Sequence, residues 1–91
     1  LYSVEKKEYF KKTFEGDFEI TSLLGNITTK DGKPYLHLHI NFADSELKTF
    51  GGHLNECKIC ATAEIFIKSL PCKLKRFYDE ETGLNLFLPK S

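Results

Sequence analysis

Aliphatic and polar side chains alternate without interruption from residue 35 to residue 42. The aliphatic set is Leu36, Leu38 and Ile40, and the set between them is Tyr35, His37, His39 and Asn41. Because successive side chains of a strand point to opposite faces, this pattern predicts a strand with its aliphatic side chains on one face and both histidines on the other. The Asp31-Gly32 pair just before it is a strong hairpin signal, since glycine adopts positive φ at no steric cost. The sequence therefore predicts an antiparallel hairpin here.

Other segments are typical of strands because they are rich in β-branched and aromatic residues. We expect strands over residues 18–28, 48–54, 59–70, 73–78 and 84–88. Residues 7–14 are interpreted as an edge strand, with a short amphipathic helix as the alternative. A helix is also the alternative for 59–70, and Pro71 ends that segment because proline cannot donate to a ladder. Gly25 within its strand indicates a bulge or a close backbone approach.

Length and charge narrow the class of protein. The 91 residues hold no linker and no repeat, so 1–91 is expected to be a single domain. Thirteen basic and thirteen acidic residues cancel, which removes any long-range attraction to nucleic acid or to an anionic membrane. No apolar run approaches the roughly 20 residues that span a bilayer. Because methionine is absent, the chain is expected to be processed, truncated or cut from a longer protein, and the odd count of three cysteines favours reduced thiols in the cytoplasm.

The three histidines form the clearest candidate site. His37 and His39 share one face of their strand, and His53 follows in the next predicted strand, behind Gly51 and Gly52. Glycines there allow close approach, so the three imidazoles are expected to hold one divalent metal ion, zinc in the first place. Three histidines with an open position are typical of catalytic zinc. The alternative is that these are unrelated surface or core histidines, since a lone His-x-His pair is weak evidence.

The cysteines offer a second, weaker metal pattern. Cys57 and Cys60 have the spacing of half a zinc knuckle, but no second close pair follows them, and Cys72 stands apart. Small buried apolar thiols are the preferred interpretation. A mixed site of His53, Cys57 and Cys60 is the minor alternative.

Two further features of the sequence, a basic run and a lone carboxylate, involve charged residues. The basic residues of one acid-free run are Lys68, Lys73, Lys75 and Arg76. With Phe77 and Tyr78 behind it, such a run can bind nucleic acid, but a solvated strand end is favoured because three acids follow at once. Glu64 is the only carboxylate in its apolar segment. It needs a partner there, and a lysine is favoured over the two alternatives, which are orienting a histidine and acting as a general base.

Six segments, in this order and at these gaps, resemble a known family. They are Gly25-Asn26-Ile27, residues 31–39, Ala43-Asp44, Gly51-Gly52-His53-Leu54, Ala61-Thr62-Ala63-Glu64 and residues 78–84. From about Phe14 onward the chain is similar to the plants-and-prokaryotes-conserved (PPC) domain, which follows AT-hook motifs in plants and usually stands alone in bacteria and archaea. The resemblance implies a mixed α/β (α+β) fold dominated by an antiparallel sheet, a homotrimer, and a metal held by His37, His39 and His53.

The sequence also departs from the family. Stand-alone members carry a strand and a helix before the matching region, so this chain is expected to be the C-terminal two-thirds of the domain. No Arg-Gly-Arg is present, and Arg76 is the only arginine, so minor-groove reading of the plant kind does not carry over.

Three functions remain open. The leading hypothesis is a metal-binding, oligomeric assembly module, tied to DNA through partners and not itself an enzyme. The second is a metal-dependent enzyme of small-molecule chemistry, with a bound water as nucleophile and Glu64 as candidate base. The third is a direct DNA binder that uses the basic run, whose affinity falls steeply with salt.

Overall fold

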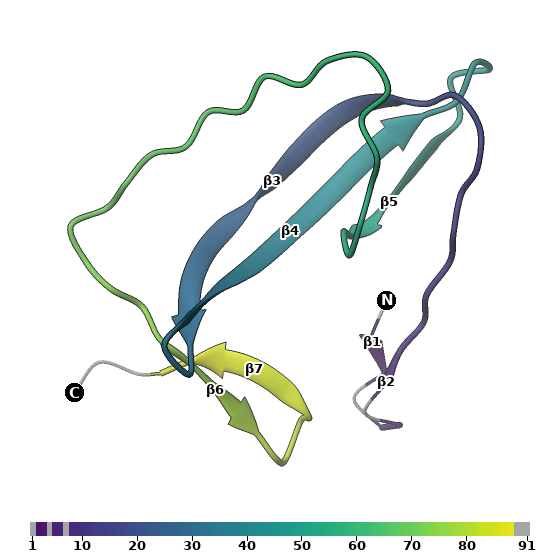
Figure 1. Ribbon diagram of the computed structural model, residues 1–91. Coiled ribbons are helices and arrows are strands. Elements are labelled where there is room, and N and C mark those ends of the chain that lie inside the picture. Colours follow the sequence, from purple (N-terminus) through teal and green to yellow (C-terminus); the bar gives the residue numbers. More distant parts are fainter. Residues whose placement is uncertain (1, 4, 7, 89–91) are drawn as a thin grey trace.

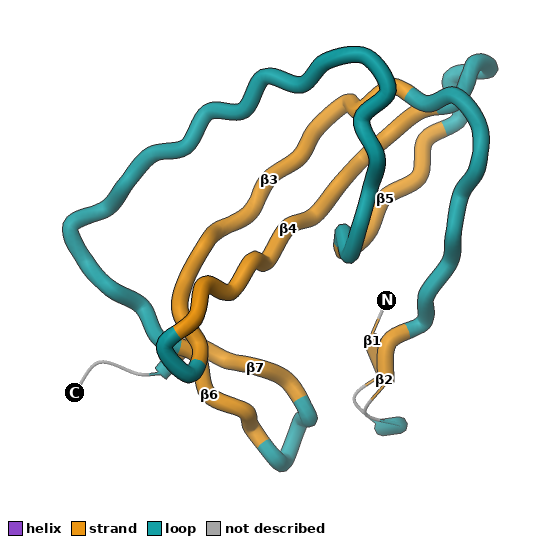
Figure 2. Tube along the Cα trace, in the orientation of Figure 1, coloured by secondary structure: helices purple, strands orange, loops and turns teal. Residues whose placement is uncertain are grey.

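The computed structural model describes residues 2–3, 5–6 and 8–88, which form strands and no helix (Figures 1 and 2). The central three-stranded sheet has the order β3-β4-β5, and two two-stranded sheets, β1-β2 and β6-β7, accompany it. The strands are β1 (Tyr2–Ser3), β2 (Glu8–Tyr9), β3 (Glu19–Lys30), β4 (Lys33–Ala43), β5 (Thr49–His53), β6 (Arg76–Asp79) and β7 (Leu84–Phe87). All these strand pairs are antiparallel.

The predicted hairpin is confirmed. Strands β3 and β4 pair from Lys30 opposite Lys33, which leaves a two-residue turn. Asp31 has φ 54° and Gly32 has φ 76°. Positive φ at both central residues is what a type I′ turn requires, and its twist matches that of the strands. This turn fixes the register of the whole hairpin.

Gly25 allows β3 to lie close to β4, which is one of the two roles predicted for it. A Cβ at Gly25 would overlap the backbone oxygen of His37 and lie 2.8 Å from the Cα of Leu38. The bulge of β3 lies elsewhere, between Ile20 and Ser22. Gly25 therefore lets β3 lie against β4 at the point where β4 carries the histidines.

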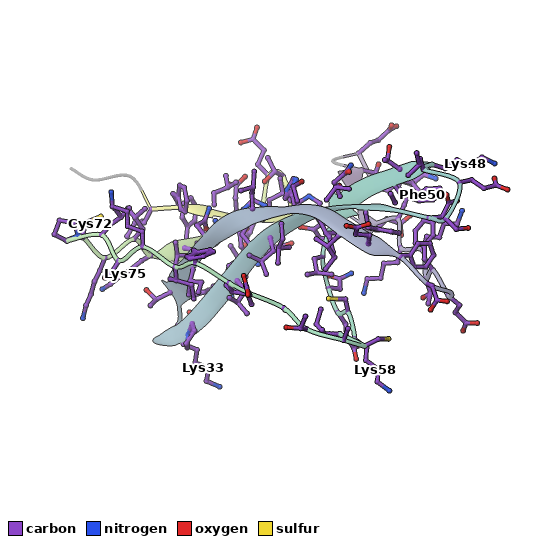
Figure 3. All side chains as sticks on the ribbon, turned by 90° about the horizontal axis from the view of Figure 1, so that it is seen from above. Lys33, Lys48, Phe50, Lys58, Cys72 and Lys75 are labelled. Carbon is purple, nitrogen blue, oxygen red and sulfur yellow. The ribbon has the colours of Figure 1, made fainter. Side chains whose placement is uncertain are left out.

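Aromatic side chains of β4 and β5 pack against a residue that precedes β3. Phe42 and Phe50 pack against Phe14, whose ring centroid lies 5.1 Å and 4.8 Å from theirs. Beyond this cluster burial is slight, and Ala43, 8% exposed, is the one buried hydrophobic residue of the described part of the chain. The view from above shows a thin sheet with side chains on both sides (Figure 3). The molecule measures 48 × 35 × 17 Å, so a single layer of sheet does not enclose a core.

The strand predicted for 59–70 is wrong, and so is its helical alternative. Between β5 and β6 the described chain forms no strand and no helix, and it arches away from the sheet in Figure 1. It rejoins the sheet only at its end, where Thr29 donates its backbone N–H to the carbonyl oxygen of Leu74 at 3.1 Å. A strand needs a neighbour to satisfy its backbone groups, and this segment has no ladder partner among the described residues.

Other expectations need smaller corrections. The edge strand expected over 7–14 shrinks to β2, and residue 7 lies outside the described residues. The strand expected over 73–78 begins only at Arg76. The helical part of the mixed α/β class is not supported, because none of the described residues forms a helix. None of them forms a helix that could cross a membrane.

Candidate metal centre

The three histidines converge on one face of the central sheet. Strand β4 supplies His37 and His39, and β5 places His53 directly opposite His39. The ring centroids lie 5.1 Å apart for His37 and His39, 5.3 Å for His37 and His53, and 4.3 Å for His39 and His53. One nitrogen from each ring lies within 4.8 Å of the other two. The predicted site therefore exists as a geometric cluster.

One glycine of β5 makes the close approach possible. Gly51 pairs with Asn41, and a Cβ at Gly51 would lie 3.1 Å from the side-chain nitrogen of that asparagine. Such a contact is tighter than most real ones, so the Asn41 side chain would have to shift to accommodate a side chain at Gly51. Gly52 has open space around its Cβ position. Gly51 is thus close to the neighbouring strand, as predicted for the paired glycines, whereas Gly52 is not.

Two small sheets touch the cluster through one residue each. Tyr9 of β2 sets its ring edge-on to His53, with centroids 5.6 Å apart and an interplanar angle of 83°. Arg76 of β6 brings Nη2 to 3.4 Å from Nδ1 of His37. His37 is half-buried, whereas His39 and His53 are exposed. The site is therefore open to solvent between its two flanking contacts.

The surroundings lower the pKa of two of the three histidines. Burial lowers the pKa of His37, and the positive charges of Arg76 and His39 lower it further. Partial burial also lowers the pKa of His53, and the charges of His39 and His37 lower it further. A neutral imidazole keeps the lone pair that a metal ion needs. Burial and nearby positive charge thus favour the neutral form of His37 and His53, which is the form that binds metal.

The donor set fits a borderline transition metal. Imidazole nitrogens suit zinc, iron, copper and nickel, whereas magnesium and calcium prefer oxygen ligands. No carboxylate or thiol joins this group in the part of the chain that the structure describes. Three imidazoles would hold a zinc ion and leave a position for an exchangeable ligand.

The other sequence candidates lie away from the histidines. Glu64 is exposed in the segment without secondary structure, and it does not join the group. The three cysteines, Cys57, Cys60 and Cys72, are free and exposed, so the preferred interpretation as buried thiols is wrong. The mixed site of His53, Cys57 and Cys60 does not form a group in the described residues.

The fold separates Lys68 from the other three basic residues of the run. Lys73, Lys75 and Arg76 line one open cavity of about 480 Å³ beside the β3–β4 turn, and Lys68 does not reach it. The role of Arg76 beside His37 was missed, because residues 39 apart in sequence show no pattern that pairs them. The only feature of the sequence that sets Arg76 apart is that it is the single arginine of the chain.

Comparison with protein families decides the identity. The family model described as the Plants and Prokaryotes Conserved (PCC) domain, called the PPC domain above, matches residues 1–71. The chain belongs to this family. Similarity to curated proteins gives no significant match for this PPC domain.

Solved structures agree with that assignment. A metal-containing protein from Archaeoglobus fulgidus is 35% identical, with a TM-score of 0.76, and the match covers 97% of this chain and 62% of that one. A PPC protein from Pyrococcus horikoshii is 31% identical, with a TM-score of 0.73 and coverage of 100% and 63%. A protein from Bacteroides thetaiotaomicron, provisionally named as DNA-binding, is 31% identical, with a TM-score of 0.82 and coverage of 88% and 60%. This PPC domain therefore spans less than two thirds of each of these structures.

Proposed function

We propose that this PPC domain binds one divalent metal ion, zinc in the first place, through His37, His39 and His53, and that it acts as an assembly module. The convergence of three ring nitrogens within 4.8 Å carries the proposal. The name of the Archaeoglobus fulgidus structure, a metal-containing protein, supports it. When bound, the ion supplies a fixed positive charge with an open position for a donor atom. The chain's own residues hold it on a solvent-exposed sheet face, where a partner can reach it.

The assembly role rests on apolar surface that this chain leaves uncovered. Phe66 is 95% exposed, Ile67 is 74% exposed and Ile65 is 69% exposed, all within the segment that lacks a ladder partner. On the sheet itself Leu24 is 74% exposed and Leu36 is 61% exposed. Large apolar patches on a soluble protein mark interaction surfaces. A homotrimer is the arrangement that resemblance to the PPC family implies, and other copies would supply surface to cover these side chains.

Zinc titration with a size measurement tests both parts of the proposal. Equilibrium dialysis should give one zinc ion bound per chain, and light scattering behind size exclusion should give three chains per particle. His39→Ala should lose the zinc, while the control Glu64→Gln, which alters a carboxylate outside the group, should keep it. A monomer that binds no zinc would remove the proposal entirely.

A second candidate is direct contact with DNA. It is favoured by the cavity at which Lys73, Lys75 and Arg76 meet, and by two similar structures, from Bacteroides thetaiotaomicron and Ralstonia eutropha, that are provisionally named as DNA-binding. Binding through lysines to phosphates weakens steeply as salt rises. The double variant Lys73→Gln, Lys75→Gln should lose such binding, whereas Lys58→Gln should not. Salt-independent binding, or equal binding by both variants, would exclude this route.

A further inference from the structure

Arg76 joins the β6–β7 hairpin to the histidine face of the central sheet. Its Nε donates to Oγ1 of Thr28 at 2.9 Å, and its Nη2 donates to Oδ1 of Asn26 at 3.1 Å, both on β3. Its Nη1 donates to the carbonyl oxygen of Asn85 at 2.8 Å, within the hairpin. The guanidinium also stacks between two rings, with its central carbon 4.3 Å from the centroid of Phe87 and 4.9 Å from that of Tyr35. The group is therefore held rigidly.

The remaining contact of this guanidinium is with a proposed metal ligand. Nη2 of Arg76 lies 3.4 Å from Nδ1 of His37. A guanidinium only donates hydrogen bonds, so Nδ1 must present its lone pair and the proton of the neutral ring sits on Nε2. Nε2 of His37 in turn lies 3.3 Å from Nε2 of His39, which can accept that proton's hydrogen bond. Both ring nitrogens of His37 thus already have a hydrogen-bond partner.

This arrangement differs from the usual setting of a metal-binding histidine. Such a ring normally donates its second N–H to a carboxylate, a backbone carbonyl or water. Here the neighbour is itself a donor, so a ring that gives the Nε2 lone pair to an ion and carries its proton on Nδ1 would face Arg76 donor to donor. Arg76 also forms no ion pair with any described carboxylate, so its charge adds repulsion to a divalent ion.

We infer that Arg76 opposes metal uptake by His37, so that the ion and the guanidinium compete for this ring and metal binding loosens the hold of the β6–β7 hairpin on the sheet. This inference rests on the proposed metal binding. It assigns Arg76 the part of a positioning residue that sets the affinity of the site and links it to the hairpin. The contacts to Thr28, Asn26 and Asn85 remain available when the contact to His37 is lost, so the hairpin is held less tightly but is not released.

Zinc affinity measured by competition with a chelator tests the inference, on the parent, on Arg76→Met and on Lys75→Met. Removing Arg76 should tighten zinc binding by about ten-fold or more, the scale on which outer partners act on metal sites. Lys75→Met removes a neighbouring cation that does not touch the histidines, so its affinity should stay within about two-fold of the parent. Equal or weaker binding by Arg76→Met, or equal gains in both variants, would overturn the inference and leave the proposed metal site standing. Zinc binding by none of the three proteins would overturn both together.

Two measurements on the parent do not depend on whether the variant folds. Long-range nitrogen NMR of the imidazoles in the metal-free protein should place the ring proton of His37 on Nε2. Hydrogen exchange should show faster exchange of the β6–β7 amides once zinc is added. A proton on Nδ1, or hairpin exchange unchanged by bound zinc, would contradict the competition.

Discussion

His39 and His53 lie directly opposite each other on adjacent antiparallel strands, with ring centroids 4.3 Å apart. Opposed residues of such a pair have their Cβ atoms about 4.5–5.5 Å apart, which brings both rings to one point above the sheet. His37, two residues before His39, completes the group from the same face. The histidine cluster is thus a product of strand register, and it depends on the contacts that hold β4 and β5 together.

His53→Ala should therefore remove zinc binding without unfolding the domain. Losing an outer partner costs about 10–100-fold in metal affinity, and losing a ligand should cost at least as much. His53 is exposed, so its truncation leaves no buried cavity. Chelator competition measures the affinity and circular dichroism measures the fold. Retained zinc affinity in the folded variant would show that His53 is not a ligand.

Gly25→Ala should destabilise the domain, because its Cβ would overlap the backbone oxygen of His37. The expected loss in the free energy of unfolding is about 1–3 kcal/mol, the usual cost of overpacking, and urea denaturation measures it. Gly52→Ala is the matched control, since nothing lies within 4 Å of its Cβ position. That variant should stay within about 0.5 kcal/mol of the parent. A similar loss in both variants would contradict close approach at Gly25 as the cause, because the smaller chain entropy of alanine in the unfolded state favours folding.

Acid should weaken the metal-free fold. The pKa of His37 is lowered by burial and then by the charges of Arg76 and His39, and the pKa of His53 is lowered by burial and then by the other two histidines. Between the ordinary value near 6.5 and the lowered folded value, the unfolded chain binds more protons than the folded chain. Stability is therefore full above about 6.5 and falls as the pH drops through that window. The melting temperature, measured in the presence of a chelator, should therefore be highest above about pH 6.5 and fall below that pH.

A variant tests whether the histidines, and not other titrating groups, cause this loss of stability in acid. His53→Gln removes one group whose pKa is lowered, so the fall in melting temperature just below pH 6.5 should be shallower than in the parent. An unchanged slope would assign the acid response to groups outside the cluster.

Phe66→Ser should dissociate the proposed assembly while leaving the single chain as stable as before. The Phe66 side chain is 95% exposed, so it contributes little to the stability of one chain. In an assembly the same ring would be buried, and its loss would remove up to about 3 kcal/mol of apolar burial for each copy. Sedimentation velocity measures the particle size, with Lys68→Ser as a nearby polar control. A parent that is already monomeric would contradict the premise.

The sequence anticipates what depends on local periodicity. The alternation of residues 35–42 and the Asp31-Gly32 turn predict the hairpin, and the hairpin places His37 and His39 on one face. His53 could be added because β5 follows at once and pairs with β4. These relationships need only the period of a strand and a short connection.

The sequence does not anticipate what depends on partners distant in the chain. Residues 59–70 have strand-like composition, but composition does not supply the neighbouring strand that would satisfy their backbone groups. Arg76 looked like part of a basic run, yet its guanidinium lies between Tyr35 and Phe87 beside His37. The thiols looked buried and are exposed, because the segment that carries Cys57 and Cys60 does not pack into a core. Each of these outcomes is set by tertiary contacts.

Metal content of the purified protein is the most direct test of the central claim. Elemental mass spectrometry should be applied to the parent and to His39→Ala after incubation with zinc and removal of the excess. The account predicts about one zinc ion per chain in the parent and nearly none in the variant. A parent that retains no metal, or a His39→Ala variant that retains as much as the parent, would contradict it.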